Sequence, residues 1–204
     1  MEDYLNFHVT GDLGIDVKGY FLKYDNLGIY EHTINVINEL DNIKKHFGYI
    51  EPGSIIGCYC HDLGRVVRNN EILDFCFNNN IIVADEEKML PSILHQKISS
   101  FIAENVFRIT DITILNSIKY HTTLRKNPSM TEIEVFLADK MSWSEGGFRE
   151  ISQRIKETLK KSKENAVSYY LSYLHGRRDS LKLFHSDSKE AFEYFNLNHI
   201  SQMH

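Results

Sequence analysis

The chain has 204 residues, of which 42% are hydrophobic, and this is enough to fill the core of a folded domain and excludes a disordered chain. Its formal net charge of −5 argues against general nucleic-acid binding, which requires a basic surface that neutralises many phosphates. An anionic substrate must therefore be held by local positive charge or by metal ions.

The sequence predicts an all-α fold, because only three prolines occur and the glycines cluster at a few points, as in long helices joined by short turns. Residues 1–28 are expected to form an N-terminal helical extension. From Ile29 to Phe47 apolar residues recur at helical spacing, and His32 lies on the same stripe. Gly48 is expected to end this helix.

Further helices are predicted through SIIGCYCHD as far as Gly64 and over Asn70 to Asn78. The short stretch IIVA, residues 81–84, is either a strand or a turn, because β-branched residues stand there between asparagines and charged residues. A helix from Met89 to Val106 places His95 on its apolar face.

Two helices with clear start signals follow. The pair TD at residues 110–111 offers an N-cap from either residue, and the helix that it opens ends near His121. Ser129 and Glu132 have the spacing of a capping box, and the helix that they open carries Asp139 one turn after its apolar residues.

Beyond Trp143 the letters SEGG indicate a linker, followed by a long polar helix from about Arg149 to Leu174 and a short amphipathic helix at the end. Residues 145–204 are thus expected to form a C-terminal helical segment packed on a core of residues 29–144. Its tyrosines and terminal aromatic residues are candidates for a homodimer contact, notably Tyr169, Tyr170 and Tyr173.

Six ionisable residues interrupt or end apolar stripes on five predicted helices, so packing the stripes together would also bring the polar groups together. A single histidine on an apolar face is more often a hydrogen-bonded core residue. Six such coincidences favour a shared metal site, and a buried carboxylate in particular needs a cation or several donors. The candidate ligands are His32, His61, Asp62, His95, His121 and Asp139.

Imidazole and carboxylate ligands suit iron, manganese or another divalent first-row metal, and a pair of such ions is suited to phosphate-ester chemistry. The cysteines Cys58, Cys60 and Cys76 are odd in number and lack a CxxC spacing, which argues against disulfides and zinc knuckles. Cys58 and Cys60 are expected to be small buried residues rather than extra ligands. No export signal or membrane span is recognisable, so a cytoplasmic protein without membrane contact is expected.

The motifs YEHTINV, YCHDLGR, LHQKI, KYHTT and FLADK stand in the order H, HD, H, H, D. This combination resembles the HD-domain superfamily, specifically its YqeK-type members, over Ile29 to Trp143. The resemblance implies an HD-domain helical bundle, here with extra C-terminal helices, and a di-iron centre. It also implies hydrolysis of symmetrical dinucleoside tetraphosphates such as diadenosine tetraphosphate to two nucleoside diphosphates, through a hydroxide bridging the metals.

The resemblance also implies a division of the ligands: His32, His61, Asp62 and Asp139 around one metal, and Asp62, His95 and His121 around the other. Asp62 would then bridge the two ions. One departure concerns the residue three positions after Asp62, where the family usually has lysine and this chain has Arg65, a planar fork in place of a point charge.

Cationic and hydroxyl side chains near the ligands in sequence are candidates for binding the phosphates of a nucleotide: Arg65, Lys97, Thr122, Thr123, Arg125 and Lys126. Asp62 and Arg65 are the expected catalytic residues. Two alternatives stay open, an oxygenase-like di-iron protein and a non-catalytic nucleotide-sensing module. The remaining histidines are expected at the surface: His8, His46, His175, His185, His199 and His204.

Overall fold

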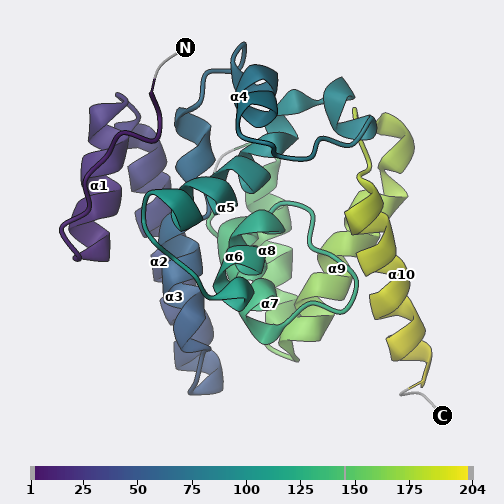
Figure 1. Cartoon of the computed structure of the whole chain (residues 1–204). Coiled ribbons are helices and arrows are strands. Elements are labelled where there is room, and N and C mark those ends of the chain that lie inside the picture. Colours follow the sequence, from purple (N-terminus) through teal and green to yellow (C-terminus); the bar gives the residue numbers. More distant parts are fainter. Residues whose placement is uncertain (1–2, 145, 202–204) are drawn as a thin grey trace.

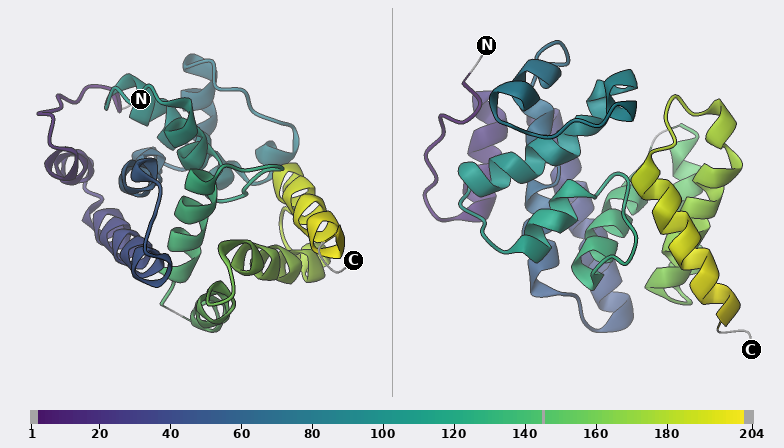
Figure 2. Two further views of the ribbon diagram at one scale, coloured as in Figure 1. Left: turned by 90° about the horizontal axis from the view of Figure 1, so that it is seen from below. Right: turned by 45° about the vertical axis from the view of Figure 1, so that its right-hand side comes forward.

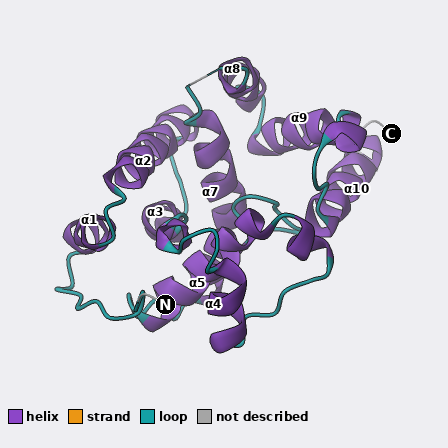
Figure 3. Ribbon diagram, turned by 90° about the horizontal axis from the view of Figure 1, so that it is seen from above, coloured by secondary structure: helices purple, strands orange, loops and turns teal. Residues whose placement is uncertain are grey.

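The structure, a computed structural model, describes residues 3–144 and 146–201, and in the last helix the side chains as far as Asn196. The described residues form helices joined by loops, with no strand among them (Figures 1 and 3), which confirms the all-α fold. The α-helices are α1 (Leu13–Lys23), α2 (Leu27–Phe47), α3 (Pro52–Cys60), α4 (Ile72–Asn78), α5 (His95–Asn105), α6 (Ile112–Lys119), α7 (Met130–Met141), α8 (Phe148–Leu159), α9 (Lys163–Gly176) and α10 (Ser186–Ser201).

Four short 3₁₀ helices complete the described secondary structure. They are η1 (Leu63–Val66), η2 (Glu86–Met89), η3 (Pro91–Leu94) and η4 (Arg178–Ser180). In the part of the chain that is described, no helix is both long enough and apolar enough to cross a bilayer.

Helix α7 is the centre of the bundle. It packs against α2, α3 and α6 on one side and against α8 and α9 on the other, as the two views of Figure 2 also show. All its residues from Thr131 to Met141 are buried. A helix that is covered on every side has no solvent face, so the ionisable residues Glu134, Asp139 and Lys140 must find partners inside the protein.

Helix α3 separates two hydrophobic cores. Cys60 belongs to a core that includes α1, α4, α5 and α6, whereas Cys58 belongs to a core that includes α2, α7, α8 and α9. The C-terminal end of α3, with the sequence His61-Asp62, therefore lies where the two cores meet. Polar groups placed at this junction are shielded from water by helices on several sides.

Several predicted helix ends are confirmed. Gly48 ends α2 with φ 76°, a left-handed conformation that glycine adopts without steric cost. The side chain of Asp111 caps α6 by accepting a hydrogen bond from the Thr113 N–H. Ser129 and Glu132 form the expected capping box at the start of α7.

Other predicted boundaries are wrong. The helix expected over Arg149 to Leu174 is two helices, because Ser162 caps a new one, α9, through a hydrogen bond from the Asn165 N–H. The helix expected from Met89 begins only at His95, after a 3₁₀ turn that starts at Pro91. For residues 81–84, where a strand and a turn were both considered, the structure shows a loop.

Among the histidines outside the cluster, one does not lie at the surface as expected. His8 and His46 are exposed, as predicted, and His175 stacks on Phe192. His185 is buried instead, and its Nε2 lies 3.2 Å from Oε1 of Glu87. This contact joins the segment before α10 to η2, 98 residues earlier. The side chains of His199 and His204 lie outside the described part.

The C-terminal helices cover the side of the molecule opposite α1 (Figure 1). Helices α8 and α9 both contact α7, and α10 packs on α9. Tyr170, considered above for a dimer contact, is buried against Phe136 and Trp143, so its ring stabilises the monomer.

Candidate metal centre

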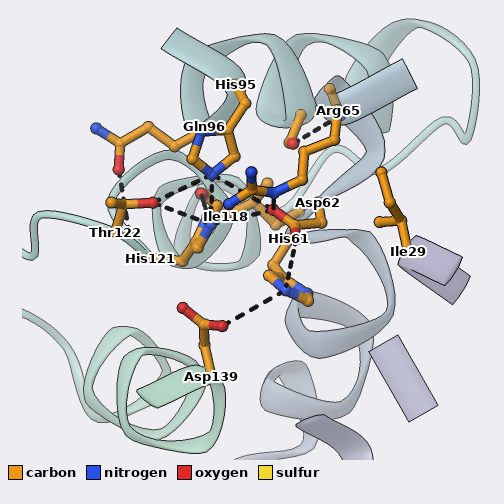
Figure 4. A network of polar contacts seen from close by, with 12 residues as sticks. Ile29, His61, Asp62, Arg65, His95, Gln96, Ile118, His121, Thr122 and Asp139 are labelled. Atoms are coloured by element: carbon orange, nitrogen blue, oxygen red, sulfur yellow. Dashed lines mark hydrogen bonds and ion pairs between the residues drawn. The ribbon is translucent and has the colours of Figure 1, made fainter. Parts of the chain in front are cut away.

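The six predicted ligands come together in space although they lie on five segments of the chain. Helix α2 supplies His32, the end of α3 supplies His61 and Asp62, and α7 supplies Asp139. His95 begins α5, and His121 follows the end of α6 (Figure 4). All six are buried except His32, whose side chain is 30% exposed at the edge of the cluster.

Three of the histidines are oriented in the same way. Nδ1 of His61 donates a hydrogen bond to the Cys58 carbonyl at 2.8 Å, that of His95 to Ser92 at 2.7 Å and that of His121 to Ile118 at 2.8 Å. In each case the acceptor is the carbonyl three residues earlier, in the last turn of a helix. A carbonyl only accepts, so Nδ1 carries the hydrogen and Nε2 presents its lone pair to the cluster.

The two carboxylate oxygens of Asp62 each face one pair of histidines. Oδ2 lies 3.7 Å from Nε2 of His32 and 3.5 Å from Nε2 of His61. Oδ1 lies 3.3 Å from Nε2 of His95 and 3.5 Å from Nε2 of His121. This arrangement divides the cluster into two groups of possible ligands that share Asp62.

Lone pairs point at one another within each group. The Nε2 atoms of His32 and His61 are 3.3 Å apart, and those of His95 and His121 are 3.1 Å apart. Such distances match neighbouring ligands of one metal ion, because bonds of about 2.1 Å place adjacent ligand atoms roughly 3.0 to 3.4 Å apart. The donor set therefore fits two divalent cations.

Asp62 supports the same conclusion. Its buried Oδ1 accepts no hydrogen bond, although Nε of Arg65 forms an ion pair with it at 2.7 Å without hydrogen-bond alignment. The Arg65 guanidinium supplies one positive charge to this buried oxygen, and a metal ion could bind the same oxygen because no hydrogen bond occupies it.

Asp139 completes the group around His32. Its Oδ1 lies 3.2 Å from Nε2 of His32, while its Oδ2 accepts a hydrogen bond of 2.6 Å from Nζ of the buried Lys140. Lys140 also donates to the His121 carbonyl, so one ammonium links α7 to the turn that carries a second ligand. Asp139 thus offers a single oxygen to the cluster in a fixed orientation.

The protonation states suit metal binding. Burial would raise the pKa of Asp62 and of Asp139, but the positive groups around them, His61 and Arg65 for Asp62 and Lys140 for Asp139, hold both well below the usual range. Burial lowers the pKa of His95 and that of His121. Near neutral pH the cluster therefore presents ionised carboxylates together with neutral rings of His95 and His121, the forms that bind metals.

Burial would also lower the pKa of His61, but the adjacent Asp62 raises it above its ordinary value. The negative field that favours a proton on this ring equally favours a metal cation beside it.

Gly64 in η1 sets the distance between Asp62 and His95. A Cβ at this position would lie 2.4 Å from the His95 carbonyl oxygen and 2.7 Å from the Ser99 nitrogen. The Gly64 N–H also donates to Oγ of Ser99 at 2.8 Å. Only glycine permits this approach, which places the HD pair against the first turn of α5.

Two of the six predicted substrate residues lie at the cluster. Arg65, 46% exposed, and Thr122 line a cavity of about 410 Å³ together with His32, Asp62 and Asp139. The Thr122 hydroxyl lies 3.2 Å from Nε2 of His95 and 3.1 Å from Nε2 of His121.

The other four predicted substrate residues do not line this cavity. Lys97 pairs with the buried Glu87 at 2.7 Å, and Arg125 pairs with Glu132 at 2.6 Å. Thr123 is buried within hydrogen-bond distance of the Gln96 amide, and Lys126 is exposed. The surroundings of these side chains do not favour the phosphate contacts expected of them.

Three residues at the site were missed from the sequence. Lys140 and Trp143 line the cavity, and Oε1 of Gln96 accepts a hydrogen bond from the Thr122 N–H at 3.1 Å and thereby holds this residue in place. A signal for Lys140 was available, because a lysine that follows the apolar run VFLA of a core helix needs an acidic partner and Asp139 precedes it.

The cysteines are not ligands in this arrangement. Burial raises the pKa of the Cys58 thiol well above its ordinary value and that of Cys60 to about 12, so both stay protonated within their cores. All three cysteines are free.

Comparison with known proteins places this cluster in a family. The HD domain model matches residues 29–144. The "Uncharacterized protein in pepC 5'region" of Lactococcus lactis subsp. cremoris is 35% identical over 64% of this chain and 66% of its own length. The "Bis(5'-nucleosyl)-tetraphosphatase, symmetrical" of Halalkalibacterium halodurans is 27% identical over 54% of this chain and 58% of its own. Both matches span less than two thirds of the relative.

A solved structure has the same fold. The crystal structure of a predicted HD superfamily hydrolase involved in NAD metabolism, from Clostridium acetobutylicum, matches with a TM-score of 0.77 and 20% identity. The match covers 89% of this chain and 96% of that one, so the likeness extends beyond residues 29–144. Because the family model spans more than half of the sequence, the chain belongs to the HD domain family.

Proposed function

We propose that the chain is a metal-dependent phosphohydrolase that cleaves symmetrical dinucleoside tetraphosphates, such as diadenosine tetraphosphate, into two nucleoside diphosphates. The observation that carries the proposal is the position of Asp62 between two histidine pairs, each facing one carboxylate oxygen. The name of the Halalkalibacterium halodurans relative supports the choice of substrate. The unpaired cysteines are consistent with a cytoplasmic location, which is part of the same proposal.

In this proposal the six ligands hold two first-row ions, with iron preferred and manganese as the main alternative, because the donors are imidazoles and carboxylates. When bound, such a pair neutralises charge on a transferred phosphoryl group and lowers the pKa of water. Asp62 would be shared by the two ions, and His32, His61 and Asp139 would complete the ligands of one of them. His95 and His121 would complete the ligands of the other.

The remaining residues bind and orient the substrate. Arg65 has a partly exposed guanidinium beside Asp62, so it can donate two hydrogen bonds to phosphate oxygens. The Thr122 hydroxyl can donate one more from the opposite edge of the cavity. Lys140 keeps the Asp139 carboxylate oriented through its 2.6 Å hydrogen bond.

Metal analysis of protein purified without chelator, followed by a hydrolysis panel, tests the proposal. We expect about two metal ions per chain and release of nucleoside diphosphate from dinucleoside tetraphosphates in preference to mononucleotides. Asp62→Ala should lose both metal ions and the activity, and retained activity would exclude the bridging role. Turnover in the absence of dioxygen separates a hydrolase from an oxygenase-like HD protein. A protein that binds nucleotides without turnover would be a sensing module.

A further inference from the structure

A second cavity adjoins the metal centre on the outer side of His32. Its volume is about 480 Å³, within the usual range for small-molecule sites. It shares Gly28, His32 and Trp143 with the cavity that contains Asp62 and Arg65, so one extended ligand can occupy both. The function proposed above does not use this second cavity.

One wall of the second cavity is aromatic. The rings of Trp143 and Phe148 lie 5.1 Å apart, and the side chain of Phe148 is 59% exposed. Trp143 is fixed from behind by Tyr170, at a ring distance of 5.9 Å, and by the ammonium of Lys140. An indole held rigidly beside an open cavity provides a stacking surface at little entropic cost.

The rest of the wall is polar and carries no positive charge. Glu31 and Asn35 stand one turn apart on α2 and line the cavity together with Ser142 and Ser144. Among the described residues that line it, none is a lysine or an arginine. The carboxylate of Glu31 repels phosphate, whereas the Asn35 amide offers both a donor and an acceptor.

The adjoining cavity has a different character, because its lining holds two ion pairs, Arg65 with Asp62 and Lys140 with Asp139, and it contains the proposed metal positions. With metal ions at the His/Asp cluster, as proposed above, that space would suit phosphates, whereas the second cavity suits a neutral aromatic group with hydroxyl or amine donors.

From this difference we infer that the second cavity binds the nucleoside part, base and ribose, of a nucleotide whose phosphates lie at the His/Asp cluster. The base stacks on one of the two perpendicular rings, Trp143 or Phe148, with the other ring at its edge. Asn35 donates and accepts hydrogen bonds of the nucleoside, and Glu31 accepts them. The inference rests on the proposed function in that the ligand is a nucleotide. It adds that one nucleoside diphosphate unit suffices for recognition, so the product itself must bind.

Intrinsic fluorescence tests this directly, because Trp143 is the only tryptophan of the 204 residues. The metal-loaded full-length protein is titrated with ADP and, separately, with pyrophosphate, and calorimetry measures both affinities. We expect ADP to quench the fluorescence and pyrophosphate to leave it nearly unchanged. Phe148→Ala should weaken ADP binding about tenfold, as expected for the loss of a stacking contact, and should leave pyrophosphate binding unchanged.

Phe77→Ala is the matched control, because Phe77 on α4 is 84% exposed and lines neither cavity. Equal affinities for ADP and pyrophosphate, or an ADP affinity that Phe148→Ala leaves unaltered, would overturn the inference. If dinucleotide hydrolysis persists in either case, only the nucleoside subsite is wrong. A protein that binds neither ligand and hydrolyses no dinucleotide would refute the proposed function as well.

Discussion

Substitution of Gly64 by alanine should damage one half of the metal centre without touching a ligand. The added Cβ would lie 2.4 Å from the His95 carbonyl oxygen and 2.7 Å from the Ser99 nitrogen. Both are backbone atoms of α5, which cannot rotate away as a flexible side chain can. The 3₁₀ turn η1 and α5 must therefore move apart, and with them Asp62 and His95.

The size of the effect follows from the distances. The contact with the His95 carbonyl must lengthen from 2.4 Å to at least 3.0 Å, the shortest distance that Cβ atoms normally adopt. Overpacking of this kind costs about 1 to 3 kcal/mol, which lowers the melting temperature of a chain of this length by roughly 2 to 12 °C. Metal sites tolerate ligand displacements of only about 0.2 Å, so the group of Asp62, His95 and His121 should lose its ion.

The assay combines thermal unfolding with metal analysis of the purified protein. We expect Gly64→Ala to retain about one metal ion per chain where the unsubstituted protein retains two. Gly53→Ala is the control, because its Cβ would meet only side chains, with Cγ1 of Ile114 nearest at 2.9 Å. A Gly64→Ala protein with unchanged melting temperature and metal content would refute the role assigned to the close approach of η1 and α5.

Three further substitutions test other parts of the structure. Arg65→Ala should raise KM for the dinucleotide by about 10- to 100-fold, as expected for lost charged hydrogen bonds, and leave the metal content unchanged; a parallel loss of metal would make Arg65 structural. Lys140→Met should cost about 3 to 5 kcal/mol in chelator-treated protein, because the buried Asp139 then loses its ammonium partner and keeps only His32 beside Oδ1. The cost should be smaller in metal-loaded protein, as measured by urea unfolding. Burial would lower the pKa of His185, but its hydrogen bond to Glu87 and the nearby carboxylates of Asp187 and Glu86 together raise this pKa above 6.5. The stability that His185 contributes is complete below pH 6.5 and is lost as the pH rises through the raised value. The difference in unfolding free energy between the unsubstituted protein and His185→Gln should shrink over that range, and a constant difference would contradict the assignment.

The ligand cluster was predictable because each member is recognisable within its own helix, as a polar residue in an apolar stripe. A histidine or aspartate within an apolar stripe, as at His32 or Asp139, must lie inside the protein, and the stripes of a helical bundle converge. The burial of each residue can thus be predicted from its own helix. That the six residues come together can be predicted without knowing the angles at which the helices cross.

The substrate residues were less predictable because the sequence around a lysine or arginine does not show which partner its side chain contacts. Lys97 and Arg65 both stand within three residues of a ligand, yet Lys97 turns to Glu87 and Arg65 to Asp62. Which partner a long side chain finds depends on the packing of η2 against α5, a contact between separate segments. His185 was misjudged for the same reason, since Glu87 lies 98 residues away.

The three similar hydrogen bonds of His61, His95 and His121 connect the fold with the chemistry. Each ring donates to a carbonyl in the last turn of a helix, so the helix ends determine which nitrogen is protonated and where the lone pair points. The metal centre therefore needs few separate orienting side chains, and it depends on where α3, η3 and α6 end. This dependence explains why the turns after these helices, including Gly64 and Thr122, matter as much as the ligands themselves. The identity of a ligand can be predicted from the sequence, whereas its orientation is determined by the backbone around it.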